Sequence, residues 1–160
     1  MVNVDQKIIP FLWFENQAEE AVNYYIKIFK NSNIKNITYY GEAGPGPKNS
    51  VMTVNFELEG QEFNALNGGP MYKFTEAISF YVKCISQDEI DYYWDKLTEA
   101  GEEQPCGWLK DKYGVSWQII PILLVEMLND TDPEKVKKVT EAMLKMKKID
   151  IKTLIEAYGT

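Results

Sequence analysis

The chain has 160 residues, a length that suits one ordinary domain or two small modules sharing a core. Its formal charge of −7 and pI near 4.7 exclude the basic surface that nucleic acids and anionic membranes attract. No apolar run reaches the roughly 20 residues of a membrane span, and the first residues do not read as a secretory leader. We therefore expect a cytoplasmic protein without nucleic-acid or membrane partners.

The sequence contains no histidine, so the usual proton shuttle and the commonest metal ligand are both missing. Any catalysis would depend on carboxylate, lysine, tyrosine, cysteine or amide groups. The two cysteines, Cys84 and Cys106, have no histidine to activate them. In a chain with cytosolic features they are expected to be free thiols rather than a disulfide.

Two parts of the chain repeat each other. The segment VNYYIKIF at residues 22–29 aligns without a gap with IDYYWDKL at 90–97, and the same offset places FLWF at 11–14 on SFYV at 79–82. Each copy is a β-branched and aromatic run, then a polar break, then an amphipathic helix. A repeated strand-helix unit predicts two similar modules that share one core.

The first module is expected at residues 8–70. Its predicted elements are a strand at 8–14, a helix at 17–29 capped by Asn16, a strand at 34–40, and a hairpin of strands at 51–58 and 62–66. The loop at 41–50 contains three glycines and two prolines. A phosphate-binding loop leads into a helix, whereas this loop leads into a strand, so it is not assigned to phosphate.

The second, shorter module is expected at residues 76–121, with a strand at 77–84, a helix at 87–100 and a hairpin of strands at 108–110 and 115–120. Only helices are predicted at 122–160. They are a short one at 123–128, one at 133–148 that Asp132 caps with Pro133 in its first turn, and one from Asp150 to 158. These helices lie outside the repeat, and their apolar stripes need a partner surface.

The duplicated strand-helix-strand-strand-strand module, with FLWF at 11–14 in the first copy and AISFYV at 77–82 in the second, resembles the vicinal oxygen chelate (glyoxalase, bleomycin resistance and dioxygenase) superfamily. More narrowly, LNGGP at 66–70, CGWLKDKYGVSWQ at 106–118 and AMLKMKKIDI at 142–151 resemble its PhnB-like branch, whose members often carry the name demethylubiquinone methyltransferase-like. The resemblance covers residues 8–158. It implies a single α+β domain at 1–160, built of duplicated βαβββ modules that form a cup-shaped cleft, with a C-terminal helical extension, and commonly a homodimer.

The branch name implies a methyl donor. No strand in this sequence leads into a glycine-rich turn and a helix, the arrangement that holds the nucleoside cofactor in doubly wound methyltransferases. We therefore expect no cofactor.

The resemblance also permits a test of the metal site. Metal-dependent members share four ligand positions, and the last of them, usually Glu, holds Gln118 here. The repeat counterpart of Gln118 is Asn64, and the first-strand positions fall on Ile9 and Ala77. Two amides and two aliphatic side chains do not make a zinc or iron site, so we expect no bound metal.

Strand alternation separates the residues under the helices from those on the opposite face. Ile8, Leu12 and Phe14 are expected under the first helix, together with Val54 and Phe56. The opposite face should line the implied cleft; the alternative is a face that is solvated or packed on a partner subunit. The predicted lining consists of aromatic and neutral polar residues: Phe11, Trp13, Thr53, Asn55, Asn64, Ser79, Tyr81 and Gln118.

Such a lining favours a metal-free protein that binds a small, flat organic molecule as a homodimer. One alternative is an enzyme of the superfamily, either methyltransferase-like or a metal-independent lyase or isomerase. Glu57 and Glu62 are candidates for acid-base work, but they flank a hairpin turn, where exposed charges are usual, and no catalytic residue is assigned. A second alternative is an interaction module that acts through the C-terminal helices. The sequence leaves open whether the protein is an enzyme.

Overall fold

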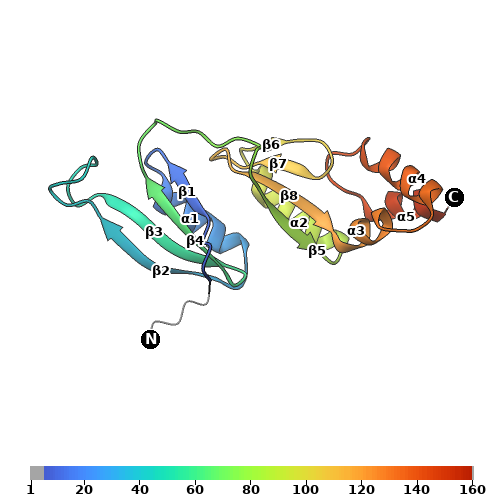
Figure 1. The fold of residues 1–160 in the computed structure, drawn as a ribbon, viewed down its shortest axis with the longest axis horizontal. Helices are drawn as coiled ribbons and strands as arrows, with labels where there is room; N and C mark the ends of the chain where they lie inside the picture. Colours follow the sequence, from blue (N-terminus) through green and yellow to red (C-terminus); the bar gives the residue numbers. More distant parts are fainter. Residues whose placement is uncertain (1–5, 160) are drawn as a thin grey trace. The chain divides into compact units, whose positions relative to one another are not determined.

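The computed structural model describes residues 6–159, and the chain divides into two compact units, with the boundary between Lys73 and Phe74. Unit 1 is coloured blue to green in Figure 1 and unit 2 green to red. Each unit contains a strand, a helix and three further strands, so the duplication read from the sequence is confirmed.

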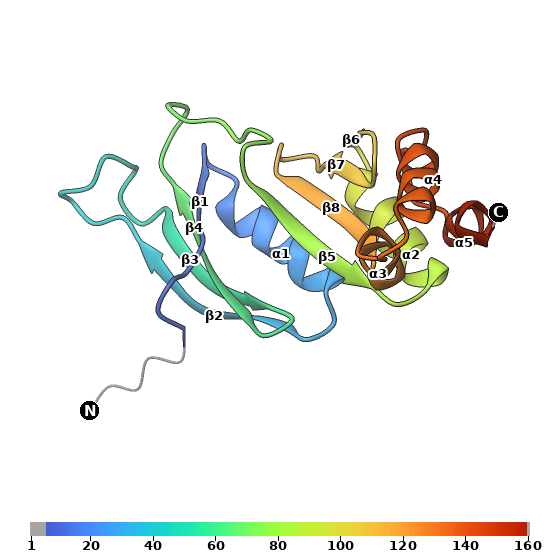
Figure 2. The same ribbon diagram turned by 45° about the vertical axis from the view of Figure 1, so that its right-hand side comes forward.

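Unit 1 consists of β1 (Phe11–Phe14), α1 (Ala18–Ile28), β2 (Ser32–Tyr39), β3 (Val51–Leu58) and β4 (Gln61–Asn67). Its sheet has the order β1-β4-β3-β2. The pair β1–β4 is parallel, and the other two pairs are antiparallel. Strands β2 and β3 run out together to the loop at 41–50 (Figure 2).

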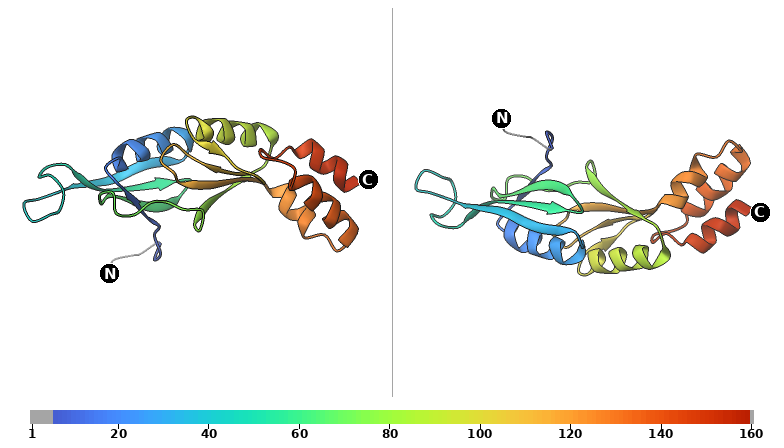
Figure 3. Two further views of the ribbon diagram at one scale, coloured as in Figure 1. Left: turned by 90° about the horizontal axis from the view of Figure 1, so that it is seen from above. Right: turned by 90° about the horizontal axis from the view of Figure 1, so that it is seen from below.

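Helix α1 covers one face of the unit 1 sheet (Figure 3). The strand residues beneath it alternate with residues on the opposite face, as the pattern predicted. The buried strand residues are Leu12, Phe14, Val54, Phe56, Leu58, Phe63 and Ala65, and the buried residues of α1 are Ala18, Ala21, Val22, Tyr25 and Ile28.

The first strand is shorter than predicted. It begins at Phe11, and Ile8 is 86% exposed rather than covered by the helix. Pro10 has no N–H to extend the ladder; only its carbonyl takes part, accepting from the Asn64 amide at 2.9 Å.

The cap of α1 also differs from the prediction. The helix follows Gln17, whose side chain makes no capping bond, and Asn16 donates its amide to the Gln17 side chain. Instead, Asn67 at the end of β4 accepts from the Ala18 amide at 2.8 Å and donates to the Val51 carbonyl. Asn67 therefore fixes the start of α1 from a distant part of the sequence, which a search for local capping residues does not find.

Unit 2 consists of β5 (Ser79–Cys84), α2 (Gln87–Thr98), β6 (Glu102–Glu103), β7 (Trp108–Lys110), β8 (Ser116–Pro121), α3 (Ile122–Leu128), α4 (Pro133–Met143) and α5 (Ile151–Gly159). Its sheet order, β5-β8-β7-β6, is that of unit 1 strand for strand. The two-residue β6 was not predicted, and it completes the fourth position. Ile78, which lies inside the strand predicted at 77–84, precedes β5 and is 75% exposed.

A buried carboxylate organises the turn between β7 and β8. Asp111 is 3% exposed and accepts from the amides of Tyr113 and Val115 and from the Trp117 indole, at 2.9, 3.0 and 2.9 Å. The motif at 106–118 thus owes part of its pattern to a turn that positions the final strand.

The helix predicted at 133–148 ends at Met143. Beyond it, the carbonyls of Met146 and Lys147 accept from the amides of Cys106 and Gly107 at 2.8 and 2.7 Å. The backbone that would have continued the helix therefore binds the start of the β7–β8 hairpin. The predicted caps at Asp132 and Asp150 are confirmed, since both carboxylates accept from amides of the first turns.

The C-terminal helices find a partner surface for their apolar stripes within unit 2. Helices α3, α4 and α5 lie together beyond the end of β8 (Figure 1). Their shared core consists of Ile120, Leu124, Met127, Val139, Ile149 and Leu154. Gln87 at the start of α2 attaches this core, donating to the Ile149 carbonyl and accepting from the Ile151 amide.

Across residues 6–159, none of the helices has both the length and the apolar character that a membrane crossing needs.

Candidate functional site

In each unit the parallel ladder sets an exposed aromatic ring beside a carboxamide on the face opposite the helix. Phe11 pairs with Asn64 in unit 1, and Tyr81 pairs with Gln118 in unit 2. Phe11 is 58% exposed and Tyr81 is 44% exposed. The strand pairing therefore makes Tyr81 the structural equivalent of Phe11. The sequence repeat instead aligns Phe11 with Ser79, two residues earlier than Tyr81. An even shift leaves each side chain on the predicted face.

Trp13 stands on the same face of unit 1 but is held by its own surroundings. Its indole donates to the Gly69 carbonyl at 2.9 Å, and its ring meets Tyr72 edge to face with centroids 4.9 Å apart. A Cβ added at Gly68 would lie 2.3 Å from the ring, so only glycine fits there. The motif at 66–70 thus fixes the Trp13 ring as well as the start of α1.

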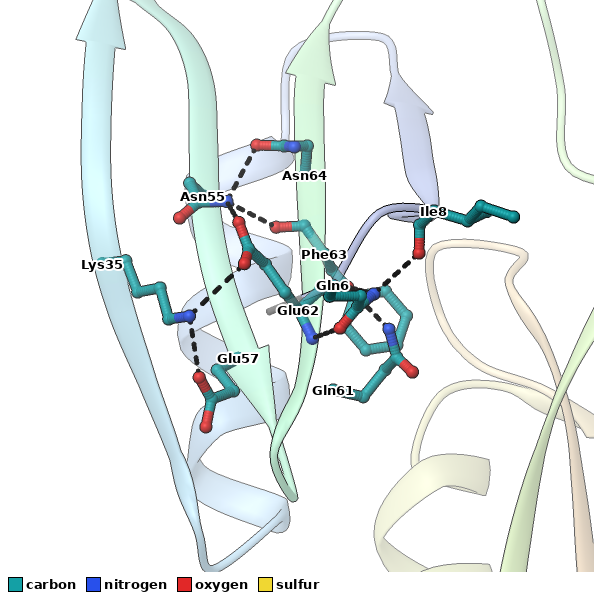
Figure 4. A network of polar contacts seen from close by, with 9 residues as sticks. All are labelled: Gln6, Ile8, Lys35, Asn55, Glu57, Gln61, Glu62, Phe63 and Asn64. Atoms are coloured by element: carbon teal, nitrogen blue, oxygen red, sulfur yellow. Dashed lines mark hydrogen bonds and ion pairs between the residues drawn. The ribbon is translucent and has the colours of Figure 1, made fainter. Parts of the chain in front are cut away.

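The polar residues of the unit 1 face form one network (Figure 4). Glu57 and Glu62 lie opposite each other in the β3–β4 ladder, and the Lys35 ammonium bridges them at 2.9 and 3.4 Å. Asn55 donates to Glu62 at 2.8 Å and to Asn64 at 3.2 Å. The network therefore satisfies the predicted residues Asn55 and Asn64 internally. Thr53 shares a 2.6 Å hydrogen bond with Thr38.

The pKa shifts within this network stabilise the charged forms of its side chains and do not prepare them for proton transfer. The hydrogen bond to Glu57 raises the pKa of Lys35, and the hydrogen bond from Asn55 lowers the pKa of Glu62. Both shifts move titration away from neutral pH, whereas a general base works best with a pKa near the operating pH.

The predicted residues of unit 2 form a smaller, uncharged group. Gln118 donates to the Ser79 hydroxyl at 2.8 Å. Tyr81 lies on the same strand as Ser79, and burial raises the pKa of its phenol, which keeps it protonated. Among the residues that the structure describes, the buried Ser116 hydroxyl has no hydrogen-bond partner.

The structure thus distributes the predicted lining between the two units: Phe11, Trp13, Thr53, Asn55 and Asn64 in unit 1, and Ser79, Tyr81 and Gln118 in unit 2. The cleft between the modules stays a prediction. Sequence reasoning missed the bridging role of Lys35 and the place of Trp108 opposite Gln118. The alternation of side chains along a strand would have been enough to place Trp108 on this face. Placing Lys35 required the pairing register of β2 with β3, which a bulge interrupts.

Two hollows were not predicted. In unit 1, a pocket of about 530 Å³ lies between the start of α1, the loop at 41–50 and the end of β4, with Tyr40 and Glu19 in its lining. In unit 2, a more open hollow of about 450 Å³ is lined by Glu76, Glu102, Glu103, Gln104, Pro105 and Trp108.

The donor atoms at the superfamily's metal position decide whether a metal ion can bind there. Asn64 and Gln118 offer amide groups, and both make hydrogen bonds to neighbouring side chains. Within residues 6–159 no three His, Cys, Asp or Glu residues cluster as metal ligands do. Neutral amides without an imidazole, thiolate or carboxylate do not fit zinc or iron.

The duplicated βαβββ architecture is the one that the resemblance to the vicinal oxygen chelate superfamily implied. The model of the family described as 3-demethylubiquinone-9 3-methyltransferase matches residues 6–120. The chain belongs to this PhnB-like family. Helices α3 to α5 lie beyond the matched residues.

Solved structures share this fold. A Bacillus cereus PhnB protein, described as a putative 3-demethylubiquinone-9 3-methyltransferase, is 41% identical with a TM-score of 0.67, over 72% of this chain and 99% of its own. A Pseudomonas aeruginosa protein is 20% identical with a TM-score of 0.61, over 73% and 98%. The Listeria monocytogenes fosfomycin resistance protein FosX shares the fold at 12% identity and a TM-score of 0.52, over 72% and 91%. Among curated proteins, the comparison finds no match.

Proposed function

We propose that the protein binds a small, flat organic molecule without the help of a metal, through the sheet faces opposite α1 and α2. The observation that carries the proposal is the repeated pair of an exposed aromatic ring and a carboxamide, Phe11 beside Asn64 and Tyr81 beside Gln118. A ring offers a stacking surface, and a carboxamide can both donate and accept a hydrogen bond.

The expected affinity is modest. Covering about 50 Å² of apolar ring surface contributes roughly 1 kcal/mol at 25 cal/mol per Å². Two rings and a few hydrogen bonds of about 1 kcal/mol each sum to only a few kcal/mol before the cost of association, so we expect weak binding, millimolar at best.

The ionisable groups favour binding over acid-base catalysis. Lys35, Glu57 and Glu62 are paired with one another. Burial raises the pKa of the Cys84 thiol to about 12, so Cys84 is not a nucleophile at neutral pH. A methyl donor finds no support in the strand-to-helix connections either, because residues 15–17 and 85–86 contain no glycine to admit a nucleoside phosphate or sugar closely.

A thermal-shift screen of the purified chain against a library of aromatic compounds tests the proposal. We expect stabilising hits whose affinity falls about tenfold in Phe11→Ala or Tyr81→Ala. Tyr92→Ala is the control, since Tyr92 is a 39% exposed aromatic residue on α2. Elemental analysis of the same sample should find no stoichiometric metal; a stoichiometric transition metal, or hits indifferent to both ring deletions, would reject the proposal.

The proposal includes a homodimer, which the superfamily resemblance implies, and a cytoplasmic location, which the sequence predicts. Light scattering at several protein concentrations measures the mass directly. A monomer at all concentrations would remove the dimer and leave the binding function to be judged by the ligand screen.

A further inference from the structure

The sheet face opposite α2 carries two neighbouring rows of side chains, each with one residue on β5, β8 and β7 in that order. The aromatic row consists of Tyr81, Gln118 and Trp108, and the donor row consists of Ser79, Ser116 and Lys110. The hydrogen bond from Gln118 to Ser79 links the two rows and confirms that they share a face.

Among the described residues, the two serine hydroxyls of the donor row have no acceptor. Ser79 uses its oxygen to accept from Gln118, which leaves its hydroxyl hydrogen to donate elsewhere. Within the described part of the chain, the Ser116 hydroxyl is buried without a partner. Buried polar groups are nearly always paired in folded proteins, so an unpaired hydroxyl next to a second donor indicates a missing acceptor.

Lys110 supplies a positive charge at the end of the donor row. Its ammonium lies 2.5 Å from the Glu76 carboxylate, which also accepts from Gln104 at 3.1 Å. An ammonium has three hydrogens, so this ion pair leaves capacity for a second acceptor. Glu76 also demonstrates that the site accommodates a carboxylate beside Lys110.

In the aromatic row, Tyr81 and Trp108 stand on either side of Gln118. Tyr81 and Trp108 stand on strands two places apart, a separation of about 10 Å. A planar ring above the Gln118 side chain would lie about 5 Å from each of the two rings, within the range of aromatic pairs. The two rows are two residues apart along each strand, about 6.7 Å. A ring with an attached carboxylate spans this distance once a hydrogen bond of about 2.8 Å is included.

We infer that unit 2 binds a small planar aromatic carboxylate, with the ring in the aromatic row and the carboxylate on the donor row. This inference rests on the proposed function and names the ligand class of one of its two faces.

Titration of the full chain with benzoate, followed by NMR chemical shifts, tests the inference. We expect saturable binding that Ser116→Ala weakens about tenfold, because a hydrogen bond to a carboxylate is lost. The same variant should be at least as stable as the parent without ligand, because it removes an unpaired buried hydroxyl.

Ser32→Ala is the matched control. Ser32 in unit 1 carries the other buried hydroxyl without a partner among residues 6–159, and it lies far from both rows in the sequence and in the other unit. It should keep the benzoate affinity of the parent. Two analogues separate the chemistry: benzamide removes the charge and cyclohexanecarboxylate removes the aromatic ring, and each should bind about tenfold more weakly than benzoate.

The outcomes distinguish this inference from the proposed function. An absence of saturable benzoate binding, or equal affinity in the parent and Ser116→Ala, overturns the inference. Aromatic hits from the library that depend on Tyr81 but not on Ser116 would preserve the proposed function and overturn the ligand class. An absence of any aromatic ligand would reject both.

Discussion

The two units share a ladder but treat the polar groups on their exposed faces differently. In unit 1, Lys35 neutralises two carboxylates and Asn55 connects them to Asn64, so the face supplies its own partners. In unit 2 the equivalent face contains an unpaired hydroxyl at Ser116. After a duplication, backbone pairing is preserved because the core requires it, whereas the opposite face is free to diverge. This difference is the reason why the inferred carboxylate site is placed in unit 2.

The hairpin turns of the two units also differ, and a substitution in the turn of unit 2 should have the largest effect on stability. Asp111 holds the β7–β8 turn through three hydrogen bonds, whereas unit 1 turns through Glu59 and Gly60, which are exposed. Asp111→Ala should cost about 3 kcal/mol, because it leaves buried donors unpaired. Urea unfolding measures the loss. Asp95→Ala, at an exposed carboxylate, is the control and should change stability by less than about 0.5 kcal/mol.

The attachment of the C-terminal helices, which only unit 2 has, gives the next largest effect. Gly107 has a φ of +80°, and an added Cβ would meet the Ile119 carbonyl at 2.9 Å. Gly107→Ala should therefore cost about 2 kcal/mol or more and loosen α4 and α5 in hydrogen exchange. Gly60→Ala has a similar φ of +82° but open space, so its cost should be about 1 kcal/mol. Equal losses of stability in the two variants would show that the positive φ alone sets the cost and that the contact with the Ile119 carbonyl adds nothing.

Helix capping sharpens the comparison further. Helix α2 is capped locally by Ser86, whereas α1 is capped by Asn67 from β4. Asn67→Ala and Ser86→Ala should each cost about 1 kcal/mol, measured by thermal unfolding. Asn16→Ala should be silent, although Asn16 is the residue that local sequence rules select. A loss in Asn16→Ala equal to that in Asn67→Ala would contradict the assignment.

The smallest effect concerns pH. The Lys110 ammonium and the Gln104 amide beside Glu76 lower the pKa of its carboxyl to about 2. Because this pKa is below the ordinary value of 4.5, the contribution to stability is complete above pH 4.5 and is lost as the pH falls toward 2. Glu76→Gln should show a flatter decline in stability across this window. An identical decline in both proteins would mean that the ion pair is fully screened by solvent.

The sequence predicted the parts of the fold that depend on local pattern. The duplicated order of elements, the buried alternation of Val54 and Phe56, and the cap at Asp132 all follow from side chains within a few residues of one another. The candidate lining was placed on the expected face for the same reason, because parity along a strand survives small errors in register.

The errors arose where distant residues decide the structure. Asn67 replaces Asn16 as the cap, and the carbonyls of Met146 and Lys147 end α4 early by binding another segment. The shortening of β1 at Pro10 is instead a local effect. The partnerless Ser116 was equally invisible, since a missing hydrogen bond is a property of the packed protein.

The bonds from Cys106 and Gly107 to Met146 and Lys147 also bear on the order of folding. During synthesis the two amides leave the ribosome well before the carbonyls that accept from them. All hydrogen-bonded strand pairs of unit 1 lie within residues 11–67, so its sheet can form while the rest of the chain is still being made. In unit 2 the amides at the start of the β7–β8 hairpin find their acceptors only after the C-terminal segment has been made. We therefore expect unit 2 to fold more slowly than unit 1.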